Sequence, residues 1–203
     1  HETYNNTTNN QALNLGIEKK LNKNLSFYGN YSESFRIPNI DERIKATTSG
    51  SFALKDQESK GVELGFIFAN TILSLNASYY QMDTKNEIQY DQSVNTNLDP
   101  IERQGLNIDL EYKPDDRQKI RTSFNYTNAE FTSGSLTPGS GGPDSCNYDN
   151  TTYCSNSNTW KNLMGGGTTF SLVGKKVPLV APVNFTINYE NELQDNLNLD
   201  LEF

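Results

Sequence analysis

The sequence contains few residues that could carry out catalysis. Its single histidine is His1, the first residue of the chain. Catalytic triads, many metal sites and most general acid–base steps near neutral pH rely on histidine as a proton carrier or ligand. We therefore expect this chain to have no enzymatic activity.

Acidic and basic side chains recur on the polar side of segments in which polar and apolar residues alternate. Residues of opposite charge on neighbouring strands can pair, and such pairs stabilise a sheet only modestly. The carboxylates and their candidate partners are Glu63, Asp109 and Glu111 with Arg103 and Arg121. A structural role explains these charges better than catalysis does.

Two polar stretches suggest ligand binding but lack the spacing that a specific site needs. The sequence DSCNYDN at residues 144–150 offers oxygen ligands, yet it has neither the one-three-five spacing nor the bidentate glutamate of a calcium loop. The three glycines at residues 165–167 lack the Lys-Ser/Thr partner of a phosphate-binding loop. We expect no metal ion and no cofactor.

The two cysteines, Cys146 and Cys154, lie close together in one polar segment. A close pair of this kind suits an oxidising compartment such as the periplasm or the cell surface. We expect a disulfide that closes a small loop and limits its freedom, with two unrelated free thiols as the alternative.

The composition excludes several classes of protein. Acids outnumber bases 25 to 17, and no basic stripe is present, which argues against nucleic-acid binding. No apolar run approaches the roughly 18 residues of a membrane-spanning helix. The mean hydropathy of -0.71 alone would fit a soluble or a disordered chain, but 11% of the residues are aromatic and the apolar residues alternate regularly with polar ones.

Apolar side chains occupy every second position in eight segments, which is the period of a β-strand with two different faces. The segments are residues 13–17, 25–31, 62–68, 73–79, 106–112, 120–126, 183–189 and 197–203. Short turns are expected at residues 22–24, 69–70, 113–116 and 192–195, so consecutive segments form hairpins.

The connections between the segments alternate in length. Long excursions are expected at about residues 33–58, at 83–100 with a short strand-like piece at 87–90, and from Thr132 over the next 45 or so residues. Bacterial outer-membrane barrels have short periplasmic turns and long external loops, whereas a soluble sandwich has no such rhythm. Aromatic girdles at the membrane interfaces are predicted for Tyr31, Phe68, Tyr79, Tyr112, Tyr126 and Tyr189. The pattern favours a transmembrane antiparallel β-barrel of the all-β class.

Five stretches resemble, in order, the C-terminal half of the barrel of TonB-dependent outer-membrane receptors. They are YSESFRIPNIDE (31–42), LKDQESKGVELGF (54–66), YY followed by NEI (79–88), RQGL with LEY (103–112) and GKKVPLVAP (174–182). The second stretch departs from the family pattern at Asp56, where proline is usual.

The resemblance implies a 22-stranded barrel closed by an N-terminal plug, of which residues 1–203 would form about eight strands. It implies a location in the bacterial outer membrane and uptake of a scarce nutrient, such as an iron chelate or cobalamin, driven by the TonB complex. The expected partners are outer-membrane lipid, TonB through the missing plug, and the nutrient. The plug and several strands beyond Phe203 are expected outside this sequence, although the alternation up to Phe203 imitates a barrel C-terminus.

The longest excursion would then face the outside and contribute to nutrient capture or lid closure. Its aromatic residues Tyr148, Tyr153 and Trp160 are the candidate ligand contacts, and the cysteine pair would help the loop to keep its shape. Nothing in the sequence distinguishes one nutrient from another.

Two alternatives remain open at this point. A complete eight-stranded barrel acting as an adhesin or structural protein fits the strand count. A soluble sandwich that binds a ligand would turn the apolar face into a dry core.

Overall fold

The computed structural model describes residues 9–44, 54–91, 94–136, 170–194 and 197–202. Eight long strands form one antiparallel sheet in the order β1-β2-β3-β4-β7-β8-β11-β12. Their bounds are β1 Leu13–Lys20, β2 Leu25–Arg36, β3 Gln57–Ala69, β4 Leu73–Lys85, β7 Ile101–Tyr112, β8 Gln118–Phe131, β11 Val183–Gln194 and β12 Leu197–Glu202. All eight alternating segments are therefore strands.

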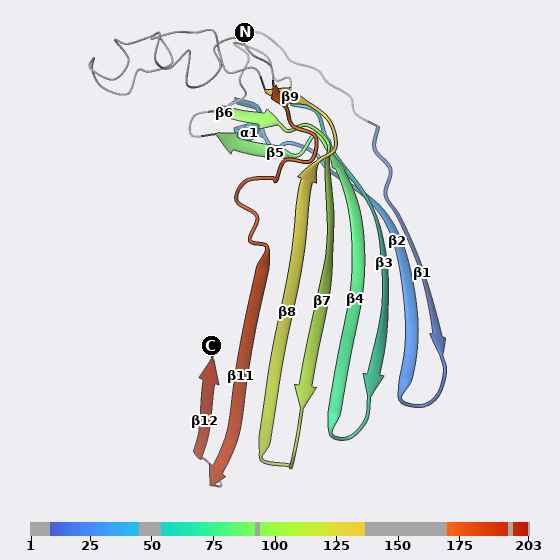
Figure 1. Ribbon diagram of the computed structural model, residues 1–203, viewed down its shortest axis with the longest axis vertical. Helices are drawn as coiled ribbons and strands as arrows, with labels where there is room; N and C mark the ends of the chain where they lie inside the picture. The colour runs from blue at the N-terminus through green and yellow to red at the C-terminus, as the bar shows by residue number, and fades with distance from the viewer. Residues whose placement is uncertain (1–8, 45–53, 92–93, 137–169, 195–196, 203) are drawn as a thin grey trace, which may run out of the picture.

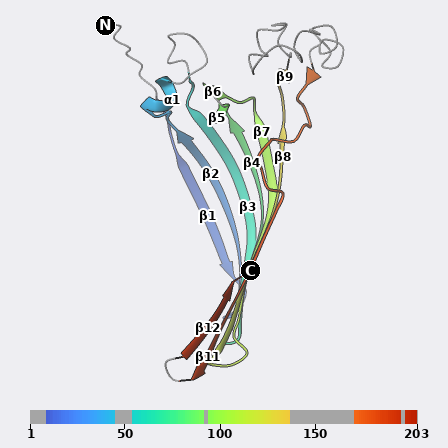
Figure 2. The ribbon, with the colours of Figure 1, turned by 90° about the vertical axis from the view of Figure 1, so that its left-hand side faces the viewer.

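The sheet is a curved, open wall (Figures 1 and 2). Strands β1 and β12 occupy its two edges, and no pairing joins them among the described residues. A closed eight-stranded barrel would pair its first and last strands, so the wall does not have that architecture. No second large sheet covers either face within the described part of the chain, as a sandwich would require.

The short turns lie at one end of the wall and the long excursions at the other (Figure 1). The excursions contain the helix α1 (Ile40–Ile44) and two small sheets, of β5 (Ile88–Asp91) with β6 (Val94–Asn97) and of β9 (Ser135–Leu136) with β10 (Phe170–Ser171). The strand-like piece predicted at residues 87–90 is thus β5. We call the two ends the turn end and the outer end.

One face of the wall carries rows of apolar side chains that no other described segment of the chain covers. The strand register places Leu64, Tyr79, Leu106, Tyr126 and Val183 in one such row across five strands. Leu64 is 64% exposed and Val183 is 52% exposed, so this face has the character of a surface that meets lipid.

The apolar rows end below the outer end, although the strands continue. On β7 they run from Leu106 to Tyr112. Six residue steps of about 3.4 Å give about 20 Å of strand, or roughly 16 Å of height at a tilt of about 40°. A mixed row of Tyr31, Val62, Gln81, Gln104 and Asn128 follows toward the outer end. The next row on the same face is charged, and consists of Glu33, Lys60, Asp83, Glu102 and Glu130.

The predicted aromatic girdle residues lie on the apolar face. Tyr112 and Tyr189 belong to its row nearest the turn end, and Tyr31 lies at the opposite margin. The Tyr79 hydroxyl donates to Gln104 Oε1 at 3.0 Å, and that of Tyr189 donates to Gln118 Oε1 at 3.1 Å. Phe68 sits between Leu25 and Leu75, one row inside the turn-end margin.

Three of the turns at the turn end are closed by the same device. The side-chain oxygen of Asn22, Asn70 or Asp115 accepts hydrogen bonds from the backbone N–H groups two and three residues later, at 2.8 to 3.0 Å. Asparagine and aspartate favour turns because their short side chains can satisfy nearby backbone donors. The fourth turn differs from the sequence-based prediction, since β11 continues to Gln194 with a register irregularity after Glu192.

Residues 174–182 lead into β11 alongside the outer part of β8. The backbone N–H of Val177 donates to the Ala129 carbonyl at 3.0 Å, and that of Thr127 donates to the Pro182 carbonyl at 2.9 Å. Here the outer end has a small apolar core made of Ile101, Ala129, Phe131 and Val177.

Candidate functional site

The residues predicted to contact a ligand lie outside the described part of the chain. Cys146, Tyr148, Tyr153, Cys154 and Trp160 all fall within residues 137–169. Their disulfide and their role in nutrient capture therefore remain predictions. What the structure offers instead is the polar face of the wall and the base of the outer-end excursions.

The polar face carries a chain of ion pairs near the turn end. Glu111 lies 2.8 Å from Lys113 and 3.2 Å from Arg121, and Arg121 also pairs with Glu190. Glu190 in turn lies 3.3 Å from Lys119. The predicted pairing of Arg121 with a neighbouring carboxylate is confirmed, and the network links β7, β8 and β11.

Other predicted charges of this face have different partners. Arg103 pairs with Glu87 at 2.7 Å, at the base of the β4–β7 excursion, instead of with a carboxylate of the wall. Asp109 accepts a hydrogen bond from the Ser123 hydroxyl at 2.8 Å, and Glu63 accepts one from the Tyr28 hydroxyl at 3.2 Å. Each carboxylate thus bonds within the wall, as a structural role predicts.

Two tyrosines cover glycines on the polar face, an arrangement that the sequence analysis missed. Tyr28 lies directly opposite Gly65 and Tyr80 opposite Gly105 in the strand register. A Cβ atom on Gly65 would come 2.6 Å from the Tyr28 ring, and one on Gly105 would come 2.8 Å from the Tyr80 ring. Aromatic rings laid over cross-strand glycines are a known device for stabilising sheets.

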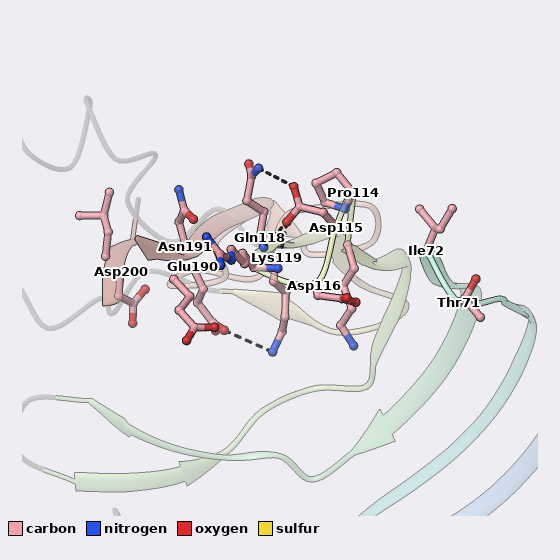
Figure 3. A pocket seen from close by; sticks show the side chains of 14 residues that line it. Thr71, Ile72, Pro114, Asp115, Asp116, Gln118, Lys119, Glu190, Asn191 and Asp200 are labelled. Atoms are coloured by element: carbon pink, nitrogen blue, oxygen red, sulfur yellow. Dashed lines mark hydrogen bonds and ion pairs between the residues drawn. The ribbon is translucent and has the colours of Figure 1, made fainter. Parts of the chain in front are cut away.

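A recess of about 740 Å³ lies at the turn end, between the β7–β8 turn and the end of β11. Figure 3 shows Lys119 and Glu190 pointing toward each other across it, and Gln118 Nε2 donates to Asp115 Oδ2 at 2.8 Å. These side chains hold the turn in shape, and the described residues that line the recess include no histidine or cysteine.

At the outer end, α1 begins with a reciprocal cap. The Glu42 N–H donates to Asn39 Oδ1 at 2.8 Å, and the Asn39 N–H donates to Glu42 Oε2 at 2.9 Å, which is a capping box. Arg36 Nη1 donates to both carboxylate oxygens of Glu42, at 2.8 and 3.0 Å. Burial raises the pKa of Glu42, but the hydrogen bonds from Arg36 and from the Asn39 backbone outweigh it and hold that pKa below its ordinary value of 4.5.

The described residues include no group of three or more histidines, cysteines or carboxylates close enough to hold a metal ion. No helix in this part of the chain is long and apolar enough to cross a membrane.

Comparison with known proteins gives one family. The model of the "TonB dependent receptor-like, beta-barrel" family matches residues 2–202. None of the curated protein sequences compared with the chain matches it.

Solved structures of outer-membrane receptors share the fold. The ferric yersiniabactin uptake receptor FyuA from Yersinia pestis matches with a TM-score of 0.60 and 14% identity over 93% of this chain and 25% of that one. The siderophore receptor PiuA from Acinetobacter baumannii matches with a TM-score of 0.60 and 16% identity over 92% of this chain and 24% of that one. The ferric-catecholate import receptor Fiu from E. coli K12 matches with a TM-score of 0.59 and 17% identity over 93% of this chain and 23% of that one. The chain therefore spans about a quarter of the length of these proteins.

Proposed function

Because the chain belongs to the TonB-dependent receptor-like β-barrel family, we propose that it is part of the wall of an outer-membrane receptor that imports a scarce nutrient. An iron chelate is the preferred cargo, with cobalamin, a similar cofactor or a metal such as copper as the other candidates. Energy would come from the TonB complex through a plug that this sequence does not include.

The observation that carries this proposal is the family match along nearly the whole chain, from residue 2 to residue 202. The two faces of the wall support it. One face has a continuous band of exposed apolar side chains across the strands, and the other has a hydrogen-bonded polar lining suited to a filled or hydrated lumen. The long excursions gather at one end, where a receptor would meet its nutrient.

The nature of the cargo rests on weaker ground. The similar structures are named a ferric yersiniabactin uptake receptor, a siderophore receptor, a ferric-catecholate import receptor and a copper transporter. Their identity to this chain is at most 17% among those four, so their names guide the choice of substrates to test and do not assign one.

The test is uptake by cells that carry the intact gene. We would compare the wild type, a deletion strain, the complemented deletion and a strain without TonB, using labelled iron as catecholate or hydroxamate complexes, labelled copper and labelled cobalamin. We expect one of these cargoes to accumulate only when both the receptor and TonB are present. Uptake that persists without TonB, or no receptor-dependent uptake of any cargo, would contradict the proposal.

The codons on either side of this sequence provide a second, cheaper test. A plug-like segment upstream and further alternating strands downstream are expected. A signal peptide directly before residue 1 together with a stop codon directly after residue 203 would contradict the receptor interpretation.

A further inference from the structure

Four segments that are distant in the sequence meet at the outer end of β2, β3 and β4. They are the residues before β1, the helix α1, the residues before β3, and the β5–β6 hairpin with its flanks. Figure 1 shows α1, β5 and β6 gathered beside one another above the wall. Asp56, the position where the sequence departs from the family motif, lies at this meeting point.

Asp56 makes contacts with three of the other segments. Asn10 Nδ2 donates to its Oδ2 at 2.6 Å, and Arg43 Nη2 lies 3.7 Å from its Oδ1. The Asp56 backbone carbonyl accepts a hydrogen bond from Asn86 Nδ2 at 3.2 Å. One residue therefore joins the chain before β1, the helix α1 and the start of the β4–β7 excursion.

Asparagines complete the connection between the excursions. Asn97 Oδ1 accepts from the Lys55 N–H at 2.8 Å, while its Nδ2 donates to the carbonyls of Lys55 and Asn86 at 3.1 and 2.8 Å. Asn95 is buried and donates to the Glu42 carbonyl at 3.1 Å. These bonds fix the hairpin β5–β6 to both sides of the β2–β3 excursion.

The ion pair in this cluster is better shielded from water than the nearby pair of Lys60 and Glu33. The side chains of Arg43 and Asp56 are 12% and 8% exposed, whereas those of Lys60 and Glu33 are 60% and 30% exposed. Asp56 Oδ1 is buried and accepts no hydrogen bond from the described residues, so the arginine charge is its main compensation. Removing one member of a buried pair leaves the other charge uncompensated, which is costly, while exposed pairs contribute little.

We propose that Asp56 is a positioning residue that holds α1, the residues before β3 and the β5–β6 hairpin together, so that these parts of the β2–β3 and β4–β7 excursions present one surface at the mouth of the receptor. We call Arg43, Asp56, Asn86 and Asn97 the clasp. This inference builds on the proposed function, because the mouth is the surface that an incoming nutrient would meet.

Ordering the mouth in advance has a physical consequence for binding. A flexible loop loses conformational entropy when it closes on a ligand, and a loop that is already held in place loses less. A broken clasp should therefore weaken nutrient binding while the transport step that follows stays intact.

The first test is amide hydrogen exchange on the full-length receptor in detergent, with Asp56→Asn compared with the wild type. We expect exchange to become roughly tenfold faster in both residues 40–44 and residues 88–91, although only the first group touches the pair directly. The matched control is Glu33→Gln, which removes an exposed pair and should leave both segments unchanged. Faster exchange around residue 56 alone, with 88–91 unaffected, would overturn the proposal.

A double-mutant cycle adds an independent measure. Arg43→Gln should accelerate exchange in the same two segments, and the double variant should be no worse than the more damaging single variant, because the two residues act as a pair. Asp56→Glu, which keeps the charge, should recover part of the protection. Fully additive effects of the two substitutions would contradict a shared role.

The binding arm uses a ferric catecholate complex as the probe. We expect Asp56→Asn to raise the concentration needed for half-maximal uptake several-fold with little change in the maximal rate, and Glu33→Gln to change neither. A lower maximal rate at unchanged half-saturation would refute the positioning role. If the wild type takes up no chelate, the proposed function fails, but the exchange experiment still decides whether the clasp exists.

Discussion

The two ends of the wall are held together by different kinds of contact. At the turn end, Asn22, Asn70 and Asp115 bond to backbone groups two and three residues away. At the outer end, Asn97 reaches across 42 residues to Lys55, and Asn95 reaches across 53 to Glu42. Each of these short turns is closed locally, whereas the excursions at the outer end are held by residues that are distant in the sequence.

Because of this difference, the turn end serves as a scaffold, whereas the outer end offers a surface whose binding specificity can change. A turn closed by its own side chain forms wherever the strand pair forms, and it depends on few other residues. An excursion closed by distant partners can be reshaped by changing those partners without disturbing the wall. The following four predictions test that separation, from the largest expected effect to the smallest.

Gly105→Ala should disturb both ends at once, because it acts on the wall between them. A Cβ atom there would lie 2.1 Å from the Tyr126 carbonyl oxygen, so the backbone must move. We expect a loss of about 3 kcal/mol in the free energy of unfolding, measured on the full-length receptor in detergent. Gly16→Ala is the control, since its Cβ would meet nothing closer than Asn30 at 3.8 Å. A wild-type stability for Gly105→Ala would show that the strands part more easily than the structure indicates.

Asn97→Ala should loosen the outer end alone. It removes three hydrogen bonds to backbone groups, and we expect a cost of about 1 to 2 kcal/mol to local opening of β5–β6. Hydrogen exchange should accelerate there and remain unchanged in the short turns. Asn97→Asp keeps the acceptor but turns a carboxylate oxygen toward the carbonyl oxygens of Lys55 and Asn86, so it should be no better than the alanine variant. Equal acceleration of hydrogen exchange at both ends would show that the outer end is not stabilised independently of the turn end.

Asp115→Ala should loosen the turn end alone, and by less than Asn97→Ala loosens the outer end. The turn loses the acceptor for the backbone N–H groups of Arg117 and Gln118, which we expect to cost about 1 kcal/mol of unfolding free energy. Asp115→Asn keeps a side-chain acceptor and should be close to neutral. The prediction fails if exchange in α1 or β5 responds to the alanine variant.

The smallest expected effect is a pH dependence confined to α1. The pKa of Glu42 is lowered in the folded protein, so its contribution to stability is complete above its ordinary pKa of 4.5 and is lost as the pH falls through the lowered value. Exchange in residues 40–44, corrected for its intrinsic pH dependence, should therefore rise below pH 4.5. Glu42→Gln should abolish that pH dependence, and an unchanged profile in this variant would assign the effect to another group.

The sequence predicted the membrane-facing part of the wall well because the signal there is local. Apolar residues alternate wherever one face meets lipid and the other does not, which identified all eight strands. It underestimated the length of several strands, because both faces become polar above the apolar rows. On β4, Gln81, Asp83 and Lys85 continue the outward positions, and the hydrogen-bonded ladder continues with them although the alternation has ended.

The outer end was predicted less well because its contacts are long-range. The capping box of Asn39 and Glu42 is a local signal for α1, which was not among the predicted elements. The partners of Asp56 had no such signal, and its only mark in the sequence was that proline is usual there. The partners predicted for Arg103 were wrong, because it pairs with Glu87, which lies in an excursion whose path the sequence does not define.

The two glycines that lie beneath tyrosines, Gly65 and Gly105, are constrained by different kinds of neighbour. At Gly65 the three nearest obstacles to a Cβ atom are all atoms of the Tyr28 side chain, which a substitution of that tyrosine would remove. At Gly105 the nearest obstacle is the backbone oxygen of Tyr126, which no substitution of Tyr80 removes. A side chain at position 65 therefore becomes easier to accommodate once Tyr28 has been replaced by a smaller residue. A side chain at position 105 requires the backbone of β8 to move, whatever residue stands at position 80.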